Sequence, residues 1–333
     1  MDDWLQPTVR RAVLVTVARV EGSVPREPGT HMLVDAVRQW GTVGGGHLEH
    51  RGADVARAML ASGETRRLER FPLGPRLGQC CGGVVHLAFE LVDAEHMAAL
   101  AARRAEDVWR LVALDGAPAL ALFDASGQQL QGGAAPAVER AGGTRVLTDA
   151  DGRRWLLDAV PAPRAHLMLF GVGHVGAAIV RALADVPCRV TWVDEREDMF
   201  PADLPHNVAI EVTDVPEALA ANAAPGTSFL VMTHSHALDL RLAETILRRT
   251  NRGPSHDWFG LIGSSTKRKQ FEHRLRERGI DGARIAAMVC PVGVPGIAGK
   301  QPAVIAVAVA AQLLMVWESS SHDTVPPALP EPH

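Results

Sequence analysis

The sequence predicts an α/β protein whose C-terminal half is a Rossmann-like, doubly wound parallel sheet, preceded by a smaller N-terminal α/β domain with a mixed sheet. After residue 165, apolar strand-like runs alternate with helical segments, which is the pattern of a parallel sheet covered by helices. A Gly-x-Gly-x-x-Gly run at residues 171–176 follows one such strand and opens a helix. With 333 residues, 47% hydrophobic and 22% charged, the chain is long enough for two globular domains.

The N-terminal half is predicted to mix strands and helices without a repeating βαβ order. Its apolar and β-branched runs predict strands at Ala12–Val20, His31–Val37, Val84–Val92, Trp109–Leu114 and Ala119–Phe123. Apolar spacing and alanine content predict helices at His47–Ala61 and Glu95–Glu106. Residues 127–152 are rich in Gly and Ala and weakly patterned, so we place the join between the domains after them, near residue 160.

In the C-terminal half, the predicted strands are separated by helices. The strands are Leu167–Phe170, Arg189–Val193, Val208–Val212, Ser228–Met232, Trp258–Ile262 and Arg284–Val289. Pro161 and Pro163 mark the join, so we expect an N-terminal domain at residues 1–160 and a Rossmann-like domain at 161–318. Residues 319–333 combine a Ser run with four prolines and are expected to form a disordered tail.

The net charge and the cysteine content indicate which partners and which cellular compartment to expect. The net charge of −4 is spread along the chain, which argues against a nucleic-acid partner. Four cysteines without framework spacing indicate a reducing compartment, so we expect a cytoplasmic protein. The apolar segment Ala303–Trp317 is shorter than a bilayer span and is interrupted by Gln312, so we predict no membrane insertion. We expect a buried helix there, in the core or at the interface of a homodimer.

Two of the four cysteines are neighbours, Cys80 and Cys81, between Gln79 and Gly82. Neighbouring Cα atoms lie about 3.8 Å apart, which is closer than ordinary disulfide geometry allows. Cysteines are often buried as small hydrophobes, but glycines on both sides favour a loop that offers soft thiolates to a ligand. The spacing does not match a zinc site.

Gly44, Gly45 and Gly46 form a glycine loop before the first predicted helix. Backbone N–H groups at the start of a helix attract anions, so this loop is a candidate site for a phosphate or an oxyanion. A tight turn without a ligand explains the same residues.

A second glycine loop contains Gly171, Gly173, His174 and Gly176, and Asp194 follows Gly176 by 18 residues. This strand, loop, helix and acid have the context of a dinucleotide fingerprint, in which the acid binds a ribose. The alternative is that Gly176 only packs the helix on the strand and that Asp194 only ends a strand.

Two further candidate segments follow predicted strands, where open α/β sheets bind ligands. His234 and His236, with Asp239 one turn later, have the types and spacing for a metal or for hydrogen bonds, although such histidines are more often surface groups. Ser264 or Ser265 is expected to cap a helix that carries Lys267 and Arg268, which would neutralise an anion or lie on a solvated basic face.

Together these stretches resemble the XdhC/CoxI family of molybdenum hydroxylase maturation proteins, and most closely its XdhC type, the xanthine dehydrogenase accessory proteins. The resemblance covers nearly the whole chain apart from the tail. The matching segments are Gly22–Arg26, Gly41–Glu49, Gly78–Gly83, Gly171–Gly176, His234–Leu240, Gly260–Arg268 and Cys290–Pro302.

The resemblance implies a molybdenum cofactor chaperone rather than an enzyme. Such proteins bind the molybdopterin cofactor, protect it, present it to a cysteine desulfurase that exchanges a molybdenum oxygen for sulfur, and assist its insertion into apo-xanthine dehydrogenase. The implied partners are this apoenzyme, the desulfurase and proteins of cofactor biosynthesis. Cys80 or Cys81 would contact molybdenum, and the two glycine loops would receive phosphate or pterin edges. We expect the cofactor between the two halves.

The chain departs from the family pattern at two positions. Ser235 stands where the family often has Asp, and Gln301 stands where it often has Glu. Both changes remove a negative charge near the expected cleft, which weakens any assignment of acid–base chemistry to those positions.

Two other functions fit parts of the sequence. An NAD(P)-dependent oxidoreductase would use the second glycine loop and Asp194, with a hydride acceptor near His234, but no catalytic acid, base and substrate clamp are found together. A thiol-based redox or metal sensor would be centred on Cys80 and Cys81 and would undergo reversible oxidation.

Overall fold

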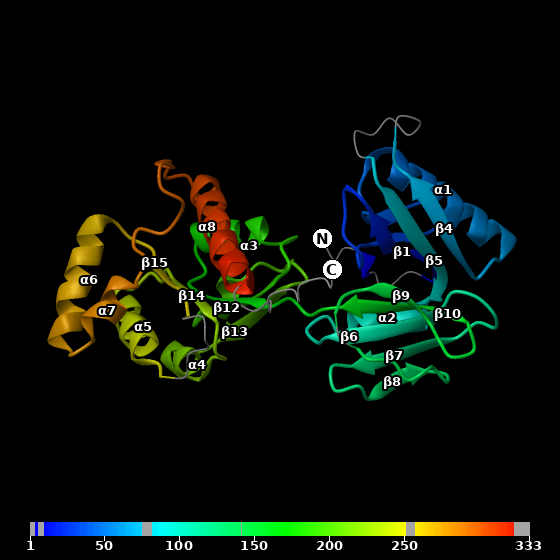
Figure 1. Ribbon diagram of the computed structural model, residues 1–333. Coiled ribbons are helices and arrows are strands. Elements are labelled where there is room, and N and C mark those ends of the chain that lie inside the picture. Colours follow the sequence, from blue (N-terminus) through cyan, green and yellow to red (C-terminus); the bar gives the residue numbers. More distant parts are fainter. Residues whose placement is uncertain (1–3, 6–9, 75–81, 141, 251–256, 323–333) are drawn as a thin grey trace, which may run out of the picture. The chain divides into compact units, whose positions relative to one another are not determined.

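Figure 1 shows a computed structural model of the chain, which describes residues 4–5, 10–74, 82–140, 142–250 and 257–322. Two units form within it, Met1–Ala162 and Pro163–His333. Each is described by itself below, as the N-terminal unit and the C-terminal unit.

The N-terminal unit contains two five-stranded sheets, each antiparallel at every described pairing, where the sequence predicted one mixed sheet. The first sheet has the order β3-β2-β1-β5-β4 and consists of β1 (Arg11–Glu21), β2 (His31–Val34), β3 (Gln39–Gly41), β4 (Arg66–Pro72) and β5 (Val84–Asp93). The second sheet has the order β8-β7-β6-β10-β9 and consists of β6 (Val108–Ala113), β7 (Leu120–Asp124), β8 (Gln129–Gly132), β9 (Arg145–Thr148) and β10 (Arg154–Val160). Helix α1 (Gly46–Ser62) lies between β3 and β4 in the sequence, and α2 (Ala94–Ala101) follows β5.

Successive side chains of β1 point to opposite faces of the first sheet, and this alternation explains how α1 and the second sheet pack against it. Val13, Val15 and Val17 point to one face of the first sheet, where they are buried with residues of α1. Leu14 points to the other face and is buried with Val108 of β6 and other residues of the second sheet. The N-terminal unit therefore has three layers, α1, the first sheet and the second sheet.

The C-terminal unit is the Rossmann-like sheet that the sequence predicts, and this part of the fold prediction is confirmed. Its strands are all parallel and have the order β13-β12-β11-β14-β15, which is the 3-2-1-4-5 order of a doubly wound sheet. The strands are β11 (Ala165–Phe170), β12 (Cys188–Asp194), β13 (Val208–Val212), β14 (Ser228–Val231) and β15 (Phe259–Leu261). The helices are α3 (His174–Ala182), α4 (Pro216–Asn222), α5 (His236–Arg248), α6 (Ser265–Glu277), α7 (Gly282–Ala286) and α8 (Pro302–His322).

Alternate residues of β11 supply the two cores of this unit. Leu167 and Leu169 are buried with residues of α3 and α8, whereas Met168 and Phe170 are buried with residues of α4, α5 and α6. Helices thus cover both faces of the sheet, as Figure 1 shows for α3 and α8 on one side. The strand order reverses between β11 and β14, and open α/β sheets bind ligands at the carboxyl ends of the strands at such a point.

Two predictions about the C-terminal unit are wrong. Arg284–Val289 is not a strand, because the Asp281 carboxylate accepts hydrogen bonds from the N–H groups of Ala283 and Arg284 and starts α7 there, leaving only an isolated bridge between Val289 and Gly260. Residues 319–322, predicted as part of a disordered tail, belong to α8. The first tail proline is Pro326, so no helix breaker precedes the end of α8.

Helix α8 is longer than the sequence analysis expected. Its 21 residues include an 18-residue stretch, Pro302–Ser319, that is apolar and long enough to cross a membrane. Core helices pass the same test, and Ala306, Val309 and Leu313 of α8 are buried against the sheet and α3. Gln312, which interrupts the apolar run, accepts a hydrogen bond from the N–H of Gly293 at 2.8 Å.

Candidate functional site

Three loops of the N-terminal unit meet at one end of its first sheet. The N–H of Gly83, just before β5, donates to the carbonyl of Ser23 in the β1–β2 loop at 3.1 Å. The ring of Pro25, in the same loop, lies so close to Gly44 that a Cβ at position 44 would be 2.6 Å from it. The Gly22–Arg26 and Gly41–Glu49 segments and the end of the Gly78–Gly83 segment are therefore neighbours, although up to 60 residues separate them in the sequence.

The Cys80–Cys81 pair and Gln79 lie outside the described residues, but both flanks of this segment are defined. The N–H of Leu73 donates to the carbonyl of Gly83 at 2.8 Å, so the chain leaves β4 and enters β5 at adjacent points. Gly82 is exposed and Gly83 is buried. The segment that carries the two thiols thus starts and ends beside the β1–β2 loop. The contact of Cys80 or Cys81 with molybdenum stays a prediction.

The glycine loop before α1 requires glycine at all three positions, since Gly44, Gly45 and Gly46 have φ of 132°, 74° and 58°. Two of its N–H groups already have partners within the chain. The N–H of Gly45 donates to the Glu49 carboxylate at 3.2 Å, and the N–H of Gly44 donates to the Thr42 hydroxyl at 3.2 Å. The Thr42 hydroxyl itself donates to Glu49. Glu49 therefore occupies the place that the sequence analysis expected a phosphate or an oxyanion to take, three residues into α1, where an acid often caps a helix.

In the C-terminal unit the second glycine loop connects β11 to α3, and its three glycines have different surroundings. Gly171 has a φ of 116°, and a Cβ there would lie 2.5 Å from the carbonyl oxygen of Met232. A Cβ on Gly176 would lie 2.5 Å from the carbonyl oxygen of Gly171, so this glycine allows α3 to pack closely on the strand. Gly173 and His174 are exposed at the start of α3, and a Cβ on Gly173 would meet nothing within 4 Å.

Asp194 lies at the end of β12 with its carboxylate directed at this loop. One oxygen accepts from the N–H of Val172 at 2.8 Å and from Arg196 Nη2 at 3.0 Å, and the other accepts from the N–H and the Nε of Arg196 at 3.1 and 2.8 Å. Burial raises the pKa of Asp194, but the hydrogen bonds from Arg196 and Val172 outweigh burial and lower it. The carboxylate is therefore ionised at neutral pH. Sequence reasoning missed Arg196, although an arginine two residues after the strand acid was visible.

His234 lies beside this site and His236 at the start of α5, and both side chains are exposed. Nε2 of His234 lies 3.8 Å from Oε1 of Glu195. Within the residues that the structure describes, no three His, Cys, Asp or Glu side chains are placed to hold a metal ion. Ser235 caps α5 by accepting from the N–H of Leu238 at 3.3 Å. Serine and aspartate are both good helix caps, which explains why the chain tolerates Ser where the family often has Asp.

The anion that meets Lys267 is a carboxylate of the chain itself. Its Nζ donates to the buried Asp239 at 2.6 Å and to the carbonyl of Ile262 at 2.9 Å. Asp239 also accepts from the N–H and the hydroxyl of Thr233 at 3.0 and 2.7 Å. Ser264 caps α6, as expected, by accepting from the N–H of Lys267 at 3.4 Å. Asp239 and Lys267 thus hold the ends of β14 and β15 together, and Asp239 is not available as a metal ligand.

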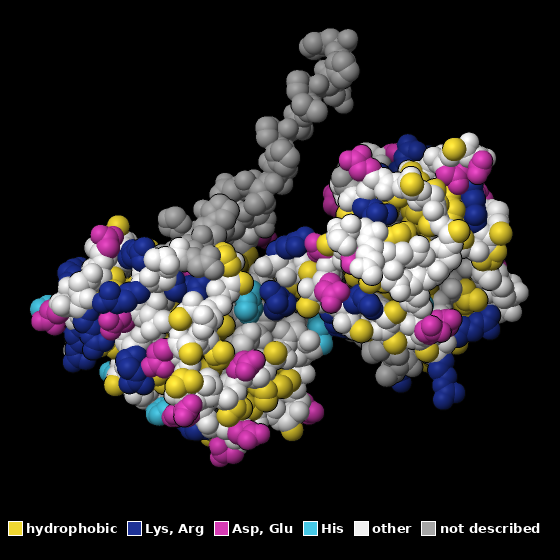
Figure 2. All heavy atoms as spheres, turned by 90° about the horizontal axis from the view of Figure 1, so that it is seen from below, with side chains coloured by type: hydrophobic (Ala, Val, Ile, Leu, Met, Phe, Trp, Pro, Cys, Tyr) yellow, Lys and Arg dark blue, Asp and Glu magenta, His cyan; other side chains and the backbone are white. Residues whose placement is uncertain are grey.

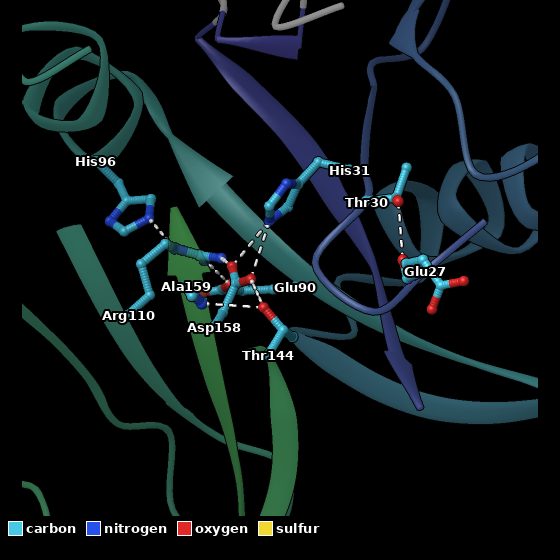
Figure 3. Close-up of polar contacts among 9 residues, drawn as sticks. All are labelled: Glu27, Thr30, His31, Glu90, His96, Arg110, Thr144, Asp158 and Ala159. Carbon is cyan, nitrogen blue, oxygen red and sulfur yellow. Dashed lines mark hydrogen bonds and ion pairs between the residues drawn. The ribbon is translucent and has the colours of Figure 1, made fainter. Parts of the chain in front are cut away.

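A buried polar cluster joins the two sheets of the N-terminal unit (Figure 3). Asp158 of β10 accepts from Arg110 Nη1 at 2.6 Å, from the Thr144 hydroxyl at 3.0 Å, and lies 2.9 Å from His31 Nε2. Arg110 also donates to Glu90 of β5. Burial raises the pKa of Asp158, but His31 and Arg110 outweigh burial and lower it to about 2. His31 directly follows the β1–β2 loop, so this cluster fixes one end of that loop.

His96 closes the other side of the cluster. Its Nε2 accepts from Arg110 Nε at 3.3 Å, while its Nδ1 is buried and has no hydrogen-bond partner among the residues that the structure describes. Burial and the nearby guanidinium lower the pKa of His96 to about 3, so the ring is neutral. Sequence reasoning missed this cluster because Glu90, Arg110 and Asp158 are single charged residues within apolar strands.

Figure 2 shows that acidic and basic side chains are interspersed over one face of both units, without a large area of one sign.

Comparison with known proteins gives matches in both units. The model of the XdhC Rossmann domain matches residues 167–313, and the model of the XdhC and CoxI family matches residues 6–72. A crystal structure from Bacillus halodurans, described as a xanthine dehydrogenase, superposes with a TM-score of 0.70 at 20% identity, covering 97% of this chain and 96% of that one. The uncharacterized protein YqeB of Escherichia coli K12 is 29% identical over 183 residues, which are 53% of this chain and 32% of YqeB. The chain thus spans about a third of the length of this curated relative.

Proposed function

The chain belongs to the XdhC and CoxI family, and we propose that it is a non-catalytic, cytoplasmic accessory protein that carries the molybdenum cofactor for a xanthine dehydrogenase. In this proposal the cofactor is a cargo. The protein protects it, presents it to a cysteine desulfurase for exchange of a molybdenum oxygen for sulfur, and delivers it to the apoenzyme.

The observation that carries the proposal is the meeting of three loops at one end of the first sheet. The hydrogen bond from Gly83 to Ser23 and the contact of Pro25 with Gly44 bring the flank of the Cys80–Cys81 segment to the glycine loop. Thiolates are soft ligands that suit a sulfur-ligated metal, and backbone N–H groups at a helix start suit a phosphate. The proposal therefore assigns the metal of the pterin to the Cys80–Cys81 segment and its phosphate to the glycine loop, where the phosphate would take the place of the Glu49 carboxylate.

Replacing Cys80 and Cys81 by alanine tests the cargo site. We expect each single variant to retain less cofactor than the wild type, and the double variant to retain almost none, because the thiolates that meet the metal are lost. Protein purified from a molybdenum-replete host is oxidised, and its fluorescent pterin and its molybdenum are measured per mole of chain. Circular dichroism establishes that the variants are folded.

The Cys188→Ala variant is the matched control. Cys188 is fully buried in β12, and burial raises the pKa of its thiol to about 11, so it does not offer a thiolate. This variant should retain wild-type amounts of pterin and molybdenum. Full retention in the Cys80→Ala/Cys81→Ala variant would refute the cargo site.

A further inference from the structure

The sheet of the C-terminal unit has one closed edge and one open edge. At the closed edge, β15 is buried and the outer side of its backbone is already paired. The N–H of Leu261 donates to the carbonyl of Val289, and the N–H of Val289 donates to the carbonyl of Phe259, each at 2.9 Å. At the open edge, β13 pairs with β12 alone among the residues that the structure describes (Figure 1). An edge strand with unpaired backbone groups is a template for a further strand.

The hydrogen bonds between β12 and β13 show which backbone groups of β13 point outward. The N–H of Thr213, just after β13, donates to the carbonyl of Asp194 at 3.2 Å, so Thr213 faces β12. Successive residues of a strand direct their N–H and C=O groups to opposite sides. The backbone groups of Val208, Ile210 and Val212 therefore point to the open edge.

The side chains at this edge are apolar and exposed. Val208, Ile210 and Val212 lie on one face of the sheet, because side chains alternate along a strand, and the last two are 38% and 44% exposed. Val215, three residues further on, is 57% exposed. Edge strands are usually protected by Lys, Pro or a bulge, but β13 contains no Lys or Pro and pairs with β12 in an unbroken register. Its one charged residue, Glu211, lies on the other face.

β13 is complementary to a second copy of itself in one antiparallel register. When two β13 strands pair about a two-fold axis at Ile210, Val208 of each copy lies opposite Val212 of the other, and Ile210 lies opposite Ile210. Pairs of β-branched side chains then meet along one face, and such pairs stabilise strand pairing. The Ile210 residues exchange two hydrogen bonds, and the N–H of each Val212 donates to the carbonyl of Val208. The N–H of Val208 keeps its 3.0 Å bond to the carbonyl of Pro205.

The charges near the strand are complementary in the same register. On the other face Glu211 of each copy lies opposite Ala209, so the two carboxylates do not oppose each other. Beyond the strand, the exposed Asp214 of one copy comes to the same end of the pair as the exposed His206 of the other. A carboxylate thus approaches an imidazole at each end. These pairings favour a second copy of this chain over a strand of another protein as the occupant of the edge.

We propose that the chain forms a homodimer through antiparallel pairing of β13 with β13 of a second copy, which joins the sheets of two C-terminal units into one continuous sheet. The dimer interface is then this edge and not α8, which was one of the alternatives from the sequence. Because two five-residue strands bury less than a standard interface, we expect a dissociation constant on the order of micromolar. The inference does not depend on the cargo proposal.

Sedimentation velocity of the full chain between about 1 and 200 µM tests the dimer. We expect the mass of the wild type to rise with concentration toward twice the 35.6 kDa of one chain. Ile210→Lys should weaken the dimer at least about tenfold, because it places two ammonium groups opposite each other at the two-fold axis. Val212→Pro should have a similar effect, because it removes an outward N–H but no hydrogen bond to β12. Circular dichroism establishes that both variants are folded.

The Met315→Lys variant is the matched control, because Met315 is 67% exposed on α8. It should dimerise as the wild type does. A wild type that is monomeric at every concentration would overturn the proposal and leave a strand of another protein as the occupant. A dimer that both β13 variants leave intact would also overturn it, as would a dimer that only Met315→Lys disrupts, which would place the interface on α8.

A mixture of two cysteine variants tests the register. Ala209 and Glu211 of the two copies lie opposite each other at a non-hydrogen-bonded position, where Cα atoms are about 4.5 Å apart, within disulfide range. In the Cys80→Ala/Cys81→Ala background, oxidation of Ala209→Cys mixed with Glu211→Cys should give a covalent dimer. Either variant alone should give at least about tenfold less, because its two new thiols are on diagonal positions. No covalent dimer in the mixture, or as much from either variant alone, would overturn the proposed pairing.

Discussion

The Asp158→Ala variant is expected to lose about 3–5 kcal/mol of unfolding free energy in the N-terminal unit, the largest effect of any single change proposed here. Asp158 and Arg110 both have an exposed fraction of 0%, and Asp158 also holds His31 and the Thr144 hydroxyl. Its removal takes the shared acceptor from His31 and Thr144 and leaves Arg110 with Glu90 as its one carboxylate partner among the described residues. A buried charge that loses its partner keeps the full cost of leaving water, which is why this loss exceeds that of a surface pair.

Urea unfolding followed by hydrogen exchange measures this loss. The amides of β1, β5, β6 and β10 report on the N-terminal unit, and those of β11, β12 and β14 serve as an internal reference. The Asp115→Ala variant is the matched control, since Asp115 pairs with Arg154 at 2.8 Å with both side chains at least 36% exposed. It should cost less than about 1 kcal/mol. Equal losses in the two variants would show that the cluster does not hold the sheets together.

The same cluster gives the N-terminal unit a defined acid dependence. The pKa of Asp158 is about 2 in the folded chain, compared with 3.8 for an unperturbed carboxyl group. Because the folded-state pKa is depressed, Asp158 contributes stability that is fully present above about pH 4 and is lost as the pH falls through about 2. The size of this contribution is about 2 kcal/mol. The difference in stability between the wild type and Asp158→Ala should therefore shrink between pH 4 and pH 2. A constant difference over that range would contradict the assignment.

The Gly83→Ala variant is expected to lose about 3 kcal/mol and to retain less of the pterin cargo. A Cβ at this position would lie 2.5 Å from the carbonyl oxygen of Ser23 and 2.6 Å from that of Glu21. Both contacts are with backbone of β1 or the loop after it, so a side-chain rotation does not relieve them. The chain has to move Gly83 away from Ser23, which separates the flank of the cysteine segment from the glycine loop.

The neighbouring glycine provides the control for this prediction. Gly82 is exposed, and a Cβ on it would meet nothing within 4 Å, so Gly82→Ala should change stability by less than about 0.5 kcal/mol. Pterin retention and urea unfolding are measured on both variants. If Gly83→Ala is as stable and as well loaded as Gly82→Ala, the contact with Ser23 has no part in holding the loops together.

The elements that sequence reasoning found are those whose apolar pattern is continuous. Val208–Val212 was predicted with the bounds that it has, and β1, β5, β6 and α1 were predicted to within one or two residues. β10 was missed because Asp158 and Arg154 interrupt its apolar pattern. A buried aspartate is expected there only if its charge is paired, and the partner, Arg110, lies on another strand. β4 was missed because four of its seven residues are charged. Whether a charged residue is buried with a partner depends on contacts between strands that are distant in the sequence. The apolar periodicity of a single segment carries no information about such contacts.

In the candidate sites too, roles that depend on one segment could be predicted, whereas contacts between distant segments could not. The roles of Gly171 and Gly176 follow from the spacing of one loop, and the backbone contacts of both glycines agree with those roles. The pairing of Lys267 with Asp239 joins residues on different helices, so the spacing of residues within one segment does not distinguish Asp239 from an external anion as the partner of Lys267. Likewise, the glycine loop before α1 has the composition of an anion site, but the contact of the Glu49 carboxylate with this loop is seen only in the folded structure.

The position of Glu49 has a consequence for any anion that enters the loop before α1. The carboxylate is tethered to the same helix whose first N–H groups it meets, so its effective concentration there is high and does not change with dilution. A phosphate bound at this loop would have to displace it, and when the phosphate left, Glu49 would return to the N–H group of Gly45. Loading becomes an exchange between two anions rather than the filling of a vacant site. Such an exchange weakens retention and eases release, which suits a loop that takes up an anion only for a time.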